Sequence, residues 1–438
     1  MPRSWHIGFA ANPITPPTGI HLAGYALRKQ GNIGVLDPVF CRALALADGR
    51  AGAVILSCDL LGLERADIQK IKTAIRRQTG LATEAIFISA THTHSGPASM
   101  HTIGIGDRDE AWMEGCLRAI IATAIQAWQR RQPGSLRLGI GETDIGVNRR
   151  GKIRRGSIHP APDPRGPVDR TLTVLWMELQ RSGTAPLMVF HCGCHPTVLG
   201  ADNRRVSADF PGATHRFLKA MLGEHADALF LNGAAGNVNP KWMGDYSQVQ
   251  RTGRRLAEQI VEIGQRSTVL LEASVRAACR SISVPFARLP SESQWKAAIR
   301  EYEQALYQAK DDEERAVLSA CLTWARRMAA QEVFREKPAG ITAEIQVLCL
   351  GDLVLLGLPF EVFAETSLTL KRAMPNPVMV CGYSNGNFGY LPPVQEIAKG
   401  GYEVEEAHKF YGYPAHFAPT AEEKVANAAR ELVESVLW

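Results

Sequence analysis

The chain has 438 residues, of which 45% are hydrophobic and 21% charged, a composition typical of a globular protein with a large buried core. Its 49 basic residues outnumber its 44 acidic residues by only five and form no long run, so the charge pattern does not indicate a nucleic-acid-binding protein. The sequence shows no secretory leader and no membrane span, and its nine scattered cysteines suggest no disulfide framework, so we expect a cytoplasmic protein.

Short apolar runs alternate along the chain with amphipathic stretches of helical length. This pattern predicts a layered α/β fold, with a mixed β-sheet core flanked by helices, in a single domain spanning residues 1–438. The expected strands are 53–58, 85–91, 172–177, 187–191, 228–231 and 378–381. A hairpin is expected from 345–350 and 353–356, and the expected helices are 65–77, 112–129, 212–222, 250–263 and 421–437.

Two segments break this alternation. Residues 147–167 are rich in Arg, Gly and Pro and are long for a connection, which favours a surface loop near a functional site. Residues 291–337 are highly charged and helix-forming, which predicts a helical hairpin inserted between strands. Such a hairpin suits a lid over a site or a contact between subunits of a homo-oligomer.

The segment ATHTHSGP, residues 90–97, follows an apolar run. If the strand continues into this segment, His92 and His94 share one face, because side chains two residues apart point the same way. Two imidazoles then converge on one spot. The alternative is a pair of polar residues that cap the strand and bond to the backbone.

The segment VFHCGCHPTVLG, residues 189–200, also carries an apolar strand into histidines, here His191 and His195. Open α/β sheets bind ligands at the carboxyl ends of their strands, so two strands that end in histidine predict a shared metal site. Cys192 and Cys194 would face the other side of an extended strand. A structural Cys/His zinc site is disfavoured because this CxC spacing lacks the usual CxxC partner.

Several further polar residues lie where strands end. Glu361, in LPFEVFAE, either contributes a carboxylate to the site or starts a helix. Residues 382–408, with GYSNGNFGYLPP followed by GGYEVEEAH, form either part of the site or a packed loop. Asp59 and Asp209 are candidates to hold a ligand imidazole by its distal N–H, with helix capping as the alternative for Asp209.

Taken in order, ATHTHSGP, HPT, GNVNP, the Glu after an apolar strand, and GYSN, YLPP and GGYE resemble the neutral, non-lysosomal ceramidase family from about residue 10 to residue 403. The resemblance implies the family's catalytic-domain fold and one zinc ion per chain. The implied ligands are His92, His195, Glu361 and Tyr402. It also implies that His94 lies near the scissile group and that Asn148-Arg149 matches an Asn-Arg pair whose Arg lies in the active site.

One departure affects the mechanism. Where the family has Gly-Asp-Val-Ser-Pro, with the Ser as nucleophile, this chain has Asn239 within Gly236 to Pro240. An Asn cannot act as that alkoxide, so either metal-activated water attacks directly, with Asn239 or the turn's backbone donating to the oxyanion, or the protein is not catalytic. We expect a zinc-dependent amidase acting on a small or N-acyl amide, with a metal-stabilised binding protein and a zinc esterase or lactonase as alternatives.

Overall fold

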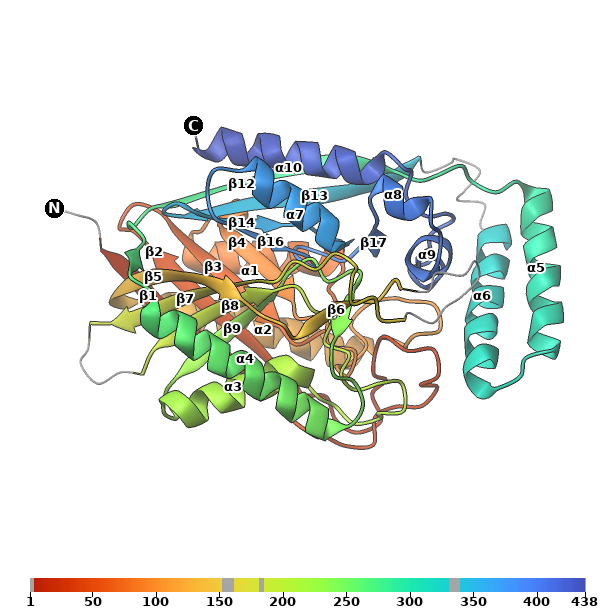
Figure 1. Cartoon of the computed structure of the whole chain (residues 1–438), viewed down its shortest axis with the longest axis horizontal. Coiled ribbons are helices and arrows are strands. Elements are labelled where there is room, and N and C mark those ends of the chain that lie inside the picture. The colour runs from red at the N-terminus through yellow and green to blue at the C-terminus, as the bar shows by residue number, and fades with distance from the viewer. Residues whose placement is uncertain (1–3, 152–160, 181–184, 331–338, 438) are drawn as a thin grey trace.

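The computed structural model describes residues 4–151, 161–180, 185–330 and 339–437. Figure 1 shows two stacked β-sheets with helices on their outer faces, which confirms the expected layered α/β fold. The strands of the large sheet, in spatial order, are β4 (Ile86–Ala90), β3 (Gly52–Cys58), β2 (Phe40–Ala47), β1 (Trp5–Pro13), β5 (Gln132–Glu142), β7 (Thr171–Leu179), β8 (Leu187–Cys192) and β9 (Asp227–Asn232), with β11 (Val269–Leu270) paired to β5.

The large sheet curls so that its two ends approach each other. Strands β3 and β4 are parallel, as are β8 and β9, although these pairs lie at opposite ends of the strand order. The Ser57 hydroxyl of β3 donates to the Phe230 carbonyl of β9 at 2.6 Å, and the Asn232 amide at the end of β9 donates to the Thr91 carbonyl at 3.0 Å. The loops that follow β4, β8 and β9 therefore meet.

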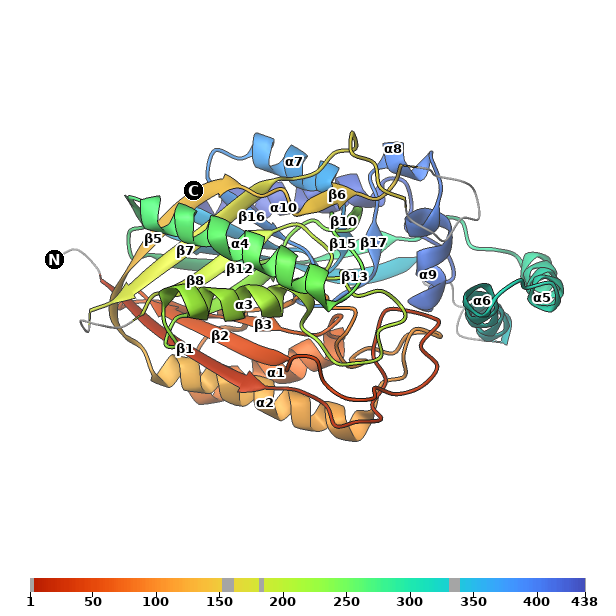
Figure 2. The ribbon, with the colours of Figure 1, turned by 60° about the horizontal axis from the view of Figure 1, so that its bottom comes forward.

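Four helices cover the large sheet (Figure 2): α1 (Arg65–Thr79) and α2 (Glu110–Gln129) beside β1 to β3, and α3 (Asp209–Leu222) and α4 (Tyr246–Arg266) beside β7 and β8. Helix α2 shows why these segments are helical. Asp109 caps it by accepting the Trp112 N–H at 2.8 Å, and Met113, Leu117 and Ile120 recur every three or four residues on its buried face.

The second sheet has the order β12 (Val275–Pro285), β13 (Gly340–Leu350), β14 (Leu353–Gly357) and β16 (Val378–Cys381). The expected hairpin is present, since Leu350 pairs with Leu353 across a turn in which Gly351 has a φ of 59°. Helices α7 (Ala364–Ala373) and α10 (Ala421–Leu437) cover this sheet (Figure 1). Short elements complete the described chain: β6 (Gly146–Asn148), β10 (Val238–Pro240), β15 (Glu361–Val362), β17 (Tyr390–Leu391), α8 (Val394–Ile397), α9 (Ala407–Phe410), a 3-10 turn (Thr83–Ala85) and a π-helical turn (Tyr402–Glu406).

The predicted helical insertion consists of α5 (Glu292–Tyr307) and α6 (Asp312–Ala330), which project from the body in Figure 1. It separates β12 from β13, two strands that pair directly along their length. Residues 331–337 of the predicted insertion, and 152–160 of the predicted loop, lie outside the described residues. None of the helices in the described ranges combines the length and apolar character needed to cross a bilayer.

Candidate metal centre

Three histidines gather where the loops after β4 and β8 meet. His92, His94 and His195 each offer a ring nitrogen, and these three nitrogens lie within 4.8 Å of one another. The Nε2 atoms of His92 and His94 are 3.3 Å apart. Among the described residues, this is the one cluster of at least three such donors that is suited to hold a metal ion.

The convergence of His92 and His94 was predicted for a reason that proves wrong. Strand β4 ends at Ala90, and His92 has a φ of 67°, so the strand does not continue through the motif. The backbone turns because the His92 N–H donates to the Leu60 carbonyl at 2.9 Å. The two imidazoles meet through a loop conformation and not through the alternation of a strand.

Only one of the two histidines at the end of β8 belongs to the cluster. His191 turns away, and its Nε2 lies 3.1 Å from the Val380 carbonyl on β16. His195 lies in the following loop, where its backbone N–H donates to the Val238 carbonyl at 3.0 Å. Cys192 and Cys194 are buried in the core and take no part in the cluster.

Glu361, the first residue of β15, brings a carboxylate to the cluster. Its Oε2 lies 3.2 Å from His92 Nε2 and 3.1 Å from His195 Nε2, and all three side chains are almost fully buried. Burial raises the pKa of Glu361, but the adjoining His92 and His195 rings lower it well below its usual range. The carboxylate is therefore ionised.

The hydrogen bonds of His92 and His195 indicate which ring nitrogen of each could bind a cation. The Nδ1 atoms of His92 and His195 lie 2.6 Å and 2.5 Å from the Leu61 and Ala235 carbonyls, which accept hydrogen bonds only, so each proton lies on Nδ1. Nε2, which faces Glu361 Oε2, is therefore the nitrogen that each ring could offer to a cation. The separations of 3.1 and 3.2 Å between Glu361 Oε2 and the two Nε2 atoms are close to the edge of about 3.3 Å that a tetrahedral zinc site with bonds of about 2.0 Å requires.

The carboxylates expected to support the ligand imidazoles do not do so, because the Leu61 and Ala235 carbonyls occupy the Nδ1 side of those rings. Asp59 instead accepts from the Phe40 N–H at 2.9 Å and from Arg42 at 3.1 Å. Asp209 accepts the Val198 and Leu199 N–H groups at 3.3 Å and 3.1 Å, and so orders the loop after His195. Both expectations are wrong.

Arg149 and Asn239 lie together beside the cluster. Strands β6 and β10 pair so that Asn239 is opposite Val147. The buried Arg149 guanidinium donates to Asn239 Oδ1 at 3.1 Å, to the Tyr390 hydroxyl at 2.8 Å and to Glu403 at 2.8 Å. Val238, whose carbonyl accepts the His195 N–H, adjoins Asn239 and connects this pair to the metal-binding residues. Asn148 holds the loop by donating to the Pro167 carbonyl at 2.9 Å.

Several tyrosines surround the cluster, and of these only Tyr402 was expected there. Tyr402 packs with its ring centroid 5.9 Å from that of Tyr390, and burial and the Glu361 charge raise its pKa. No hydrogen bond joins its hydroxyl to the cluster within the described residues, so its ligand role stays a prediction. Tyr411 donates to Glu361 Oε1 at 2.5 Å, and Tyr383 stacks on His92 at 4.1 Å. Reasoning from the sequence missed both.

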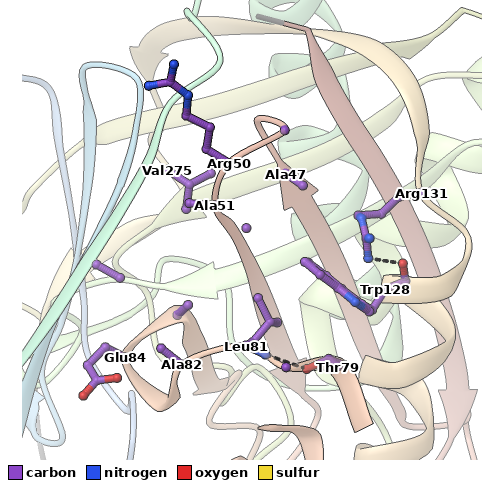
Figure 3. Close-up of a pocket in the computed structure, with 15 residues that line it drawn as sticks. Ala47, Arg50, Ala51, Thr79, Leu81, Ala82, Glu84, Trp128, Arg131 and Val275 are labelled. Carbon is purple, nitrogen blue, oxygen red and sulfur yellow. Dashed lines mark hydrogen bonds between the residues drawn. The ribbon is translucent and has the colours of Figure 1, made fainter.

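A recess of about 600 Å³ lies away from these residues (Figure 3). It is lined by the start of β3 at Gly52, the end of α1 at Thr79 and the end of α2 at Trp128. The seven residues of β3 separate it from the metal-binding loops by about 20 Å at roughly 3.3 Å per residue. Arg131 donates to the Trp128 carbonyl there, and no histidine of the cluster lines the recess.

The backbone at Gly24 fits closely against the His94 ring. Gly24 has a φ of 98°, and a Cβ atom there would overlap His94 Nδ1. We expect Gly24→Ala to lose about 1–2 kcal/mol of unfolding free energy from left-handed backbone strain. It should also displace His94 and lower any activity at least about tenfold, as a small misplacement of a reacting group does. Denaturant unfolding and steady-state kinetics measure the two effects.

Gly19→Ala is the matched control, because Gly19 has the same φ of 98° but nothing lies within 4 Å of an added Cβ. This variant should show the backbone strain without the loss of activity. Equal activity in the two variants would show that Gly24 does not position His94.

Comparisons with known proteins bear on the family and the fold of this chain. Residues 5–262, more than half of the chain, match the family described as neutral/alkaline non-lysosomal ceramidase, N-terminal. The structure of neutral ceramidase from Pseudomonas aeruginosa superposes with a TM-score of 0.76 and 18% identity, over 99% of this chain and 75% of that one. A structure described as ceramidase complexed with C2 gives the same TM-score and identity over 99% and 76%. These likenesses show a shared fold. No curated protein sequence matched.

Proposed function

The chain belongs to the neutral/alkaline non-lysosomal ceramidase family, and from that premise we propose that it is a zinc-dependent hydrolase of a carbon–nitrogen bond in an N-acyl or other small amide. One observation carries the proposal: the Nε2 atoms of two buried imidazoles and a buried carboxylate meet at one place, beside a fixed Asn–Arg pair. This donor set is typical of catalytic zinc sites, which keep a position open for water or substrate.

His92, His195 and Glu361 would hold the zinc ion, with Tyr402 as the fourth ligand that the family resemblance implies. When bound, zinc polarises the substrate carbonyl and brings the pKa of water toward neutrality. The family resemblance gives His94 a different task, near the scissile group, and its Nδ1 is buried without a hydrogen-bond partner. Its burial beside His92 and His195 lowers its pKa well below the usual range, which leaves a neutral ring that can position the substrate by a hydrogen bond.

Asn239 would stabilise the oxyanion. Arg149 has only donor groups, so its hydrogen bond fixes the Oδ1 side of the Asn239 amide and turns Nδ2 outward as a donor. Nδ2 meets only the weak acceptor Met243 Sδ, at 3.9 Å. Because an amide cannot act as the nucleophile, water is the attacking group, and Asn239 Nδ2 supplies a hydrogen bond where negative charge develops.

Metal removal tests the proposal. We expect purified protein to contain about one zinc ion per chain, to hydrolyse at least one of a panel of soluble N-acyl amides, to lose this activity on chelation and to regain it with added zinc. Metal analysis and amine release measure these outcomes. A protein without bound metal in which added zinc produces no hydrolysis would contradict the proposal.

Two alternatives remain open to the same assay. The presence of Asn239 in place of the family's serine suggests the first alternative, an inactive protein that binds metal for stability. The wild-type form of such a protein would hydrolyse none of the substrates. The variant Asn239→Ser restores the residue that the family carries. Water attack does not require an amide leaving group, which motivates a zinc esterase or lactonase. Matched esters and lactones belong in the panel, and turnover of these alone would favour that second alternative.

A further inference from the structure

A cavity of about 460 Å³ adjoins the Arg149–Asn239 pair. It follows the β6–β10 ribbon, which Figure 2 shows near β15. Its walls are largely apolar, with Val147, Val168 and Pro240 among them. Its polar residues distinguish its two ends.

Backbone pairing orders the polar residues along the cavity. Asn239 is opposite Val147, and Arg149 lies just beyond this pair at the catalytic end. In the other direction, the Lys241 N–H donates to the Ile145 carbonyl at 2.7 Å, which continues the pairing. Lys241 therefore lies about 6.6 Å further along, on the same side of the ribbon as Asn239, since it is two residues away.

The end away from the catalytic pair carries excess positive charge. The Thr143 N–H donates to the Arg170 carbonyl at 2.8 Å, which places Arg170 at this end with Lys241. The carboxylate of Asp144 accepts from Arg255 at 3.1 Å and lies 3.9 Å from Lys241 Nζ. Of the residues that line this end of the cavity, Lys241 and Arg170 are cationic and Asp144 alone is anionic, and the Asp144 charge is shared with Arg255 outside the lining.

The second acidic residue of the lining lies too far along the ribbon to offset this charge. The Asp163 N–H donates to the Asn148 carbonyl at 2.7 Å, so Asp163 belongs to the catalytic end. Its side chain accepts from the Arg165 N–H at 3.0 Å. The Lys241 end therefore keeps a surplus of cations and suits an anion.

We propose that this cavity receives the acyl group of the substrate and that Arg170 and Lys241 bind a carboxylate at its far end. The inference rests on the proposed function. The backbones of Asn239 and Lys241 are about 6.6 Å apart, and an extended chain advances about 1.2 Å per bond, so a chain of about five bonds, such as a glutaryl group from its acyl carbon to its carboxylate oxygens, spans this part of the ribbon. The preferred substrates are then amides of short dicarboxylic acids. Water adds across the C–N bond, with hydroxyl to the acyl carbon and hydrogen to nitrogen, and releases the dicarboxylate and an amine.

Paired substrates test the charge requirement. We expect glutaryl 4-nitroanilide to be hydrolysed with a kcat/KM at least about tenfold above that of pentanoyl 4-nitroanilide, which has the same chain length and no charge. In Arg170→Gln and Lys241→Gln this ratio should fall to near one, while the exposed Arg327→Gln, on α6, should keep it. A wild-type ratio of one or less, or a ratio unaffected by either pocket variant, would overturn the inference and leave the hydrolase intact.

Binding of glutarate provides a second measurement that does not need turnover. Calorimetric titration of the protein as purified should detect glutarate, and Arg170→Gln combined with Lys241→Gln should weaken its binding at least about tenfold. Equal binding to the wild type and the double variant would overturn the site. If neither anilide is hydrolysed but glutarate binding depends on both cations, the proposed function fails and the anion site stands.

Discussion

Replacing His195 with alanine is expected to remove the metal ion and the hydrolytic activity together. His195 Nε2 lies 3.1 Å from Glu361 Oε2, and the Ala235 and Val238 carbonyls fix its ring and its backbone. Without this imidazole, the proposed site loses one of its only two nitrogen ligands and no longer has the four ligands that zinc prefers. We expect zinc content to fall from about one per chain to near zero and kcat/KM to fall on the order of 10³-fold or more.

His191→Gln is the matched control, because His191 lies four residues earlier and is also buried. Its Nε2 faces the Val380 carbonyl at 3.1 Å, and a glutamine amide can donate to the same atom. This variant should retain zinc and activity. Thermal unfolding of both variants separates a lost ligand from a lost fold. If folded His195→Ala protein retains stoichiometric zinc, His195 is not a ligand.

The expected strands were all found because each is a short apolar run that the fold buries, such as β8 with all six residues buried. Two of the strands that were not expected have a different character. Strand β5 contains Pro133 and three glycines, which normally signal turns, and β12 includes exposed polar residues such as Ser281. Both are held by long antiparallel pairings, with β7 and β13 respectively. Tertiary pairing overrides local preference at these two strands.

In the candidate site, too, some features could be predicted from the sequence and others could not. Histidine and carboxylate side chains at strand ends are visible in the sequence, and His92, His195 and Glu361 do meet. The groups that hold the rings are backbone carbonyls, of Leu61 and Ala235, and every residue type supplies a carbonyl. The carboxylates of Asp59 and Asp209 therefore seemed better candidates than they are. The left-handed backbone conformation of His92 could not be predicted from the sequence either, because a positive φ is uncommon for residues other than glycine.

The tyrosines illustrate a further limit of sequence reasoning. Residues 382–408 stood out as a glycine- and aromatic-rich run, yet composition does not tell which ring faces the metal-binding residues. Tyr383 stacks on His92 from within this run, whereas Tyr411, which bonds to Glu361, lies three residues beyond its end. The π-helical turn at Tyr402–Glu406 changes the direction in which the following side chains point. No sequence pattern predicts such a turn.

Changing Asn239 to aspartate is expected to reduce activity more than changing it to alanine. Aspartate has the same shape and can still accept the hydrogen bond from Arg149, so the pair and the ribbon remain in place. It loses both Nδ2 donor hydrogens, however, and brings a negative charge to the place where the oxyanion develops. We expect kcat to fall on the order of 10²–10³-fold for Asn239→Asp and about tenfold for Asn239→Ala.

The order of these two variants distinguishes two roles for Asn239. If the side chain only positions Arg149, aspartate should be the milder change, because it keeps and strengthens the bond to Nη1 that alanine removes. If Nδ2 donates to the oxyanion, alanine should be the milder change, because a missing donor is replaced by water whereas a carboxylate repels the developing charge. Steady-state kcat values with one amide substrate, together with unchanged zinc content in both variants, decide between them. Higher activity in Asn239→Asp than in Asn239→Ala would refute the oxyanion role.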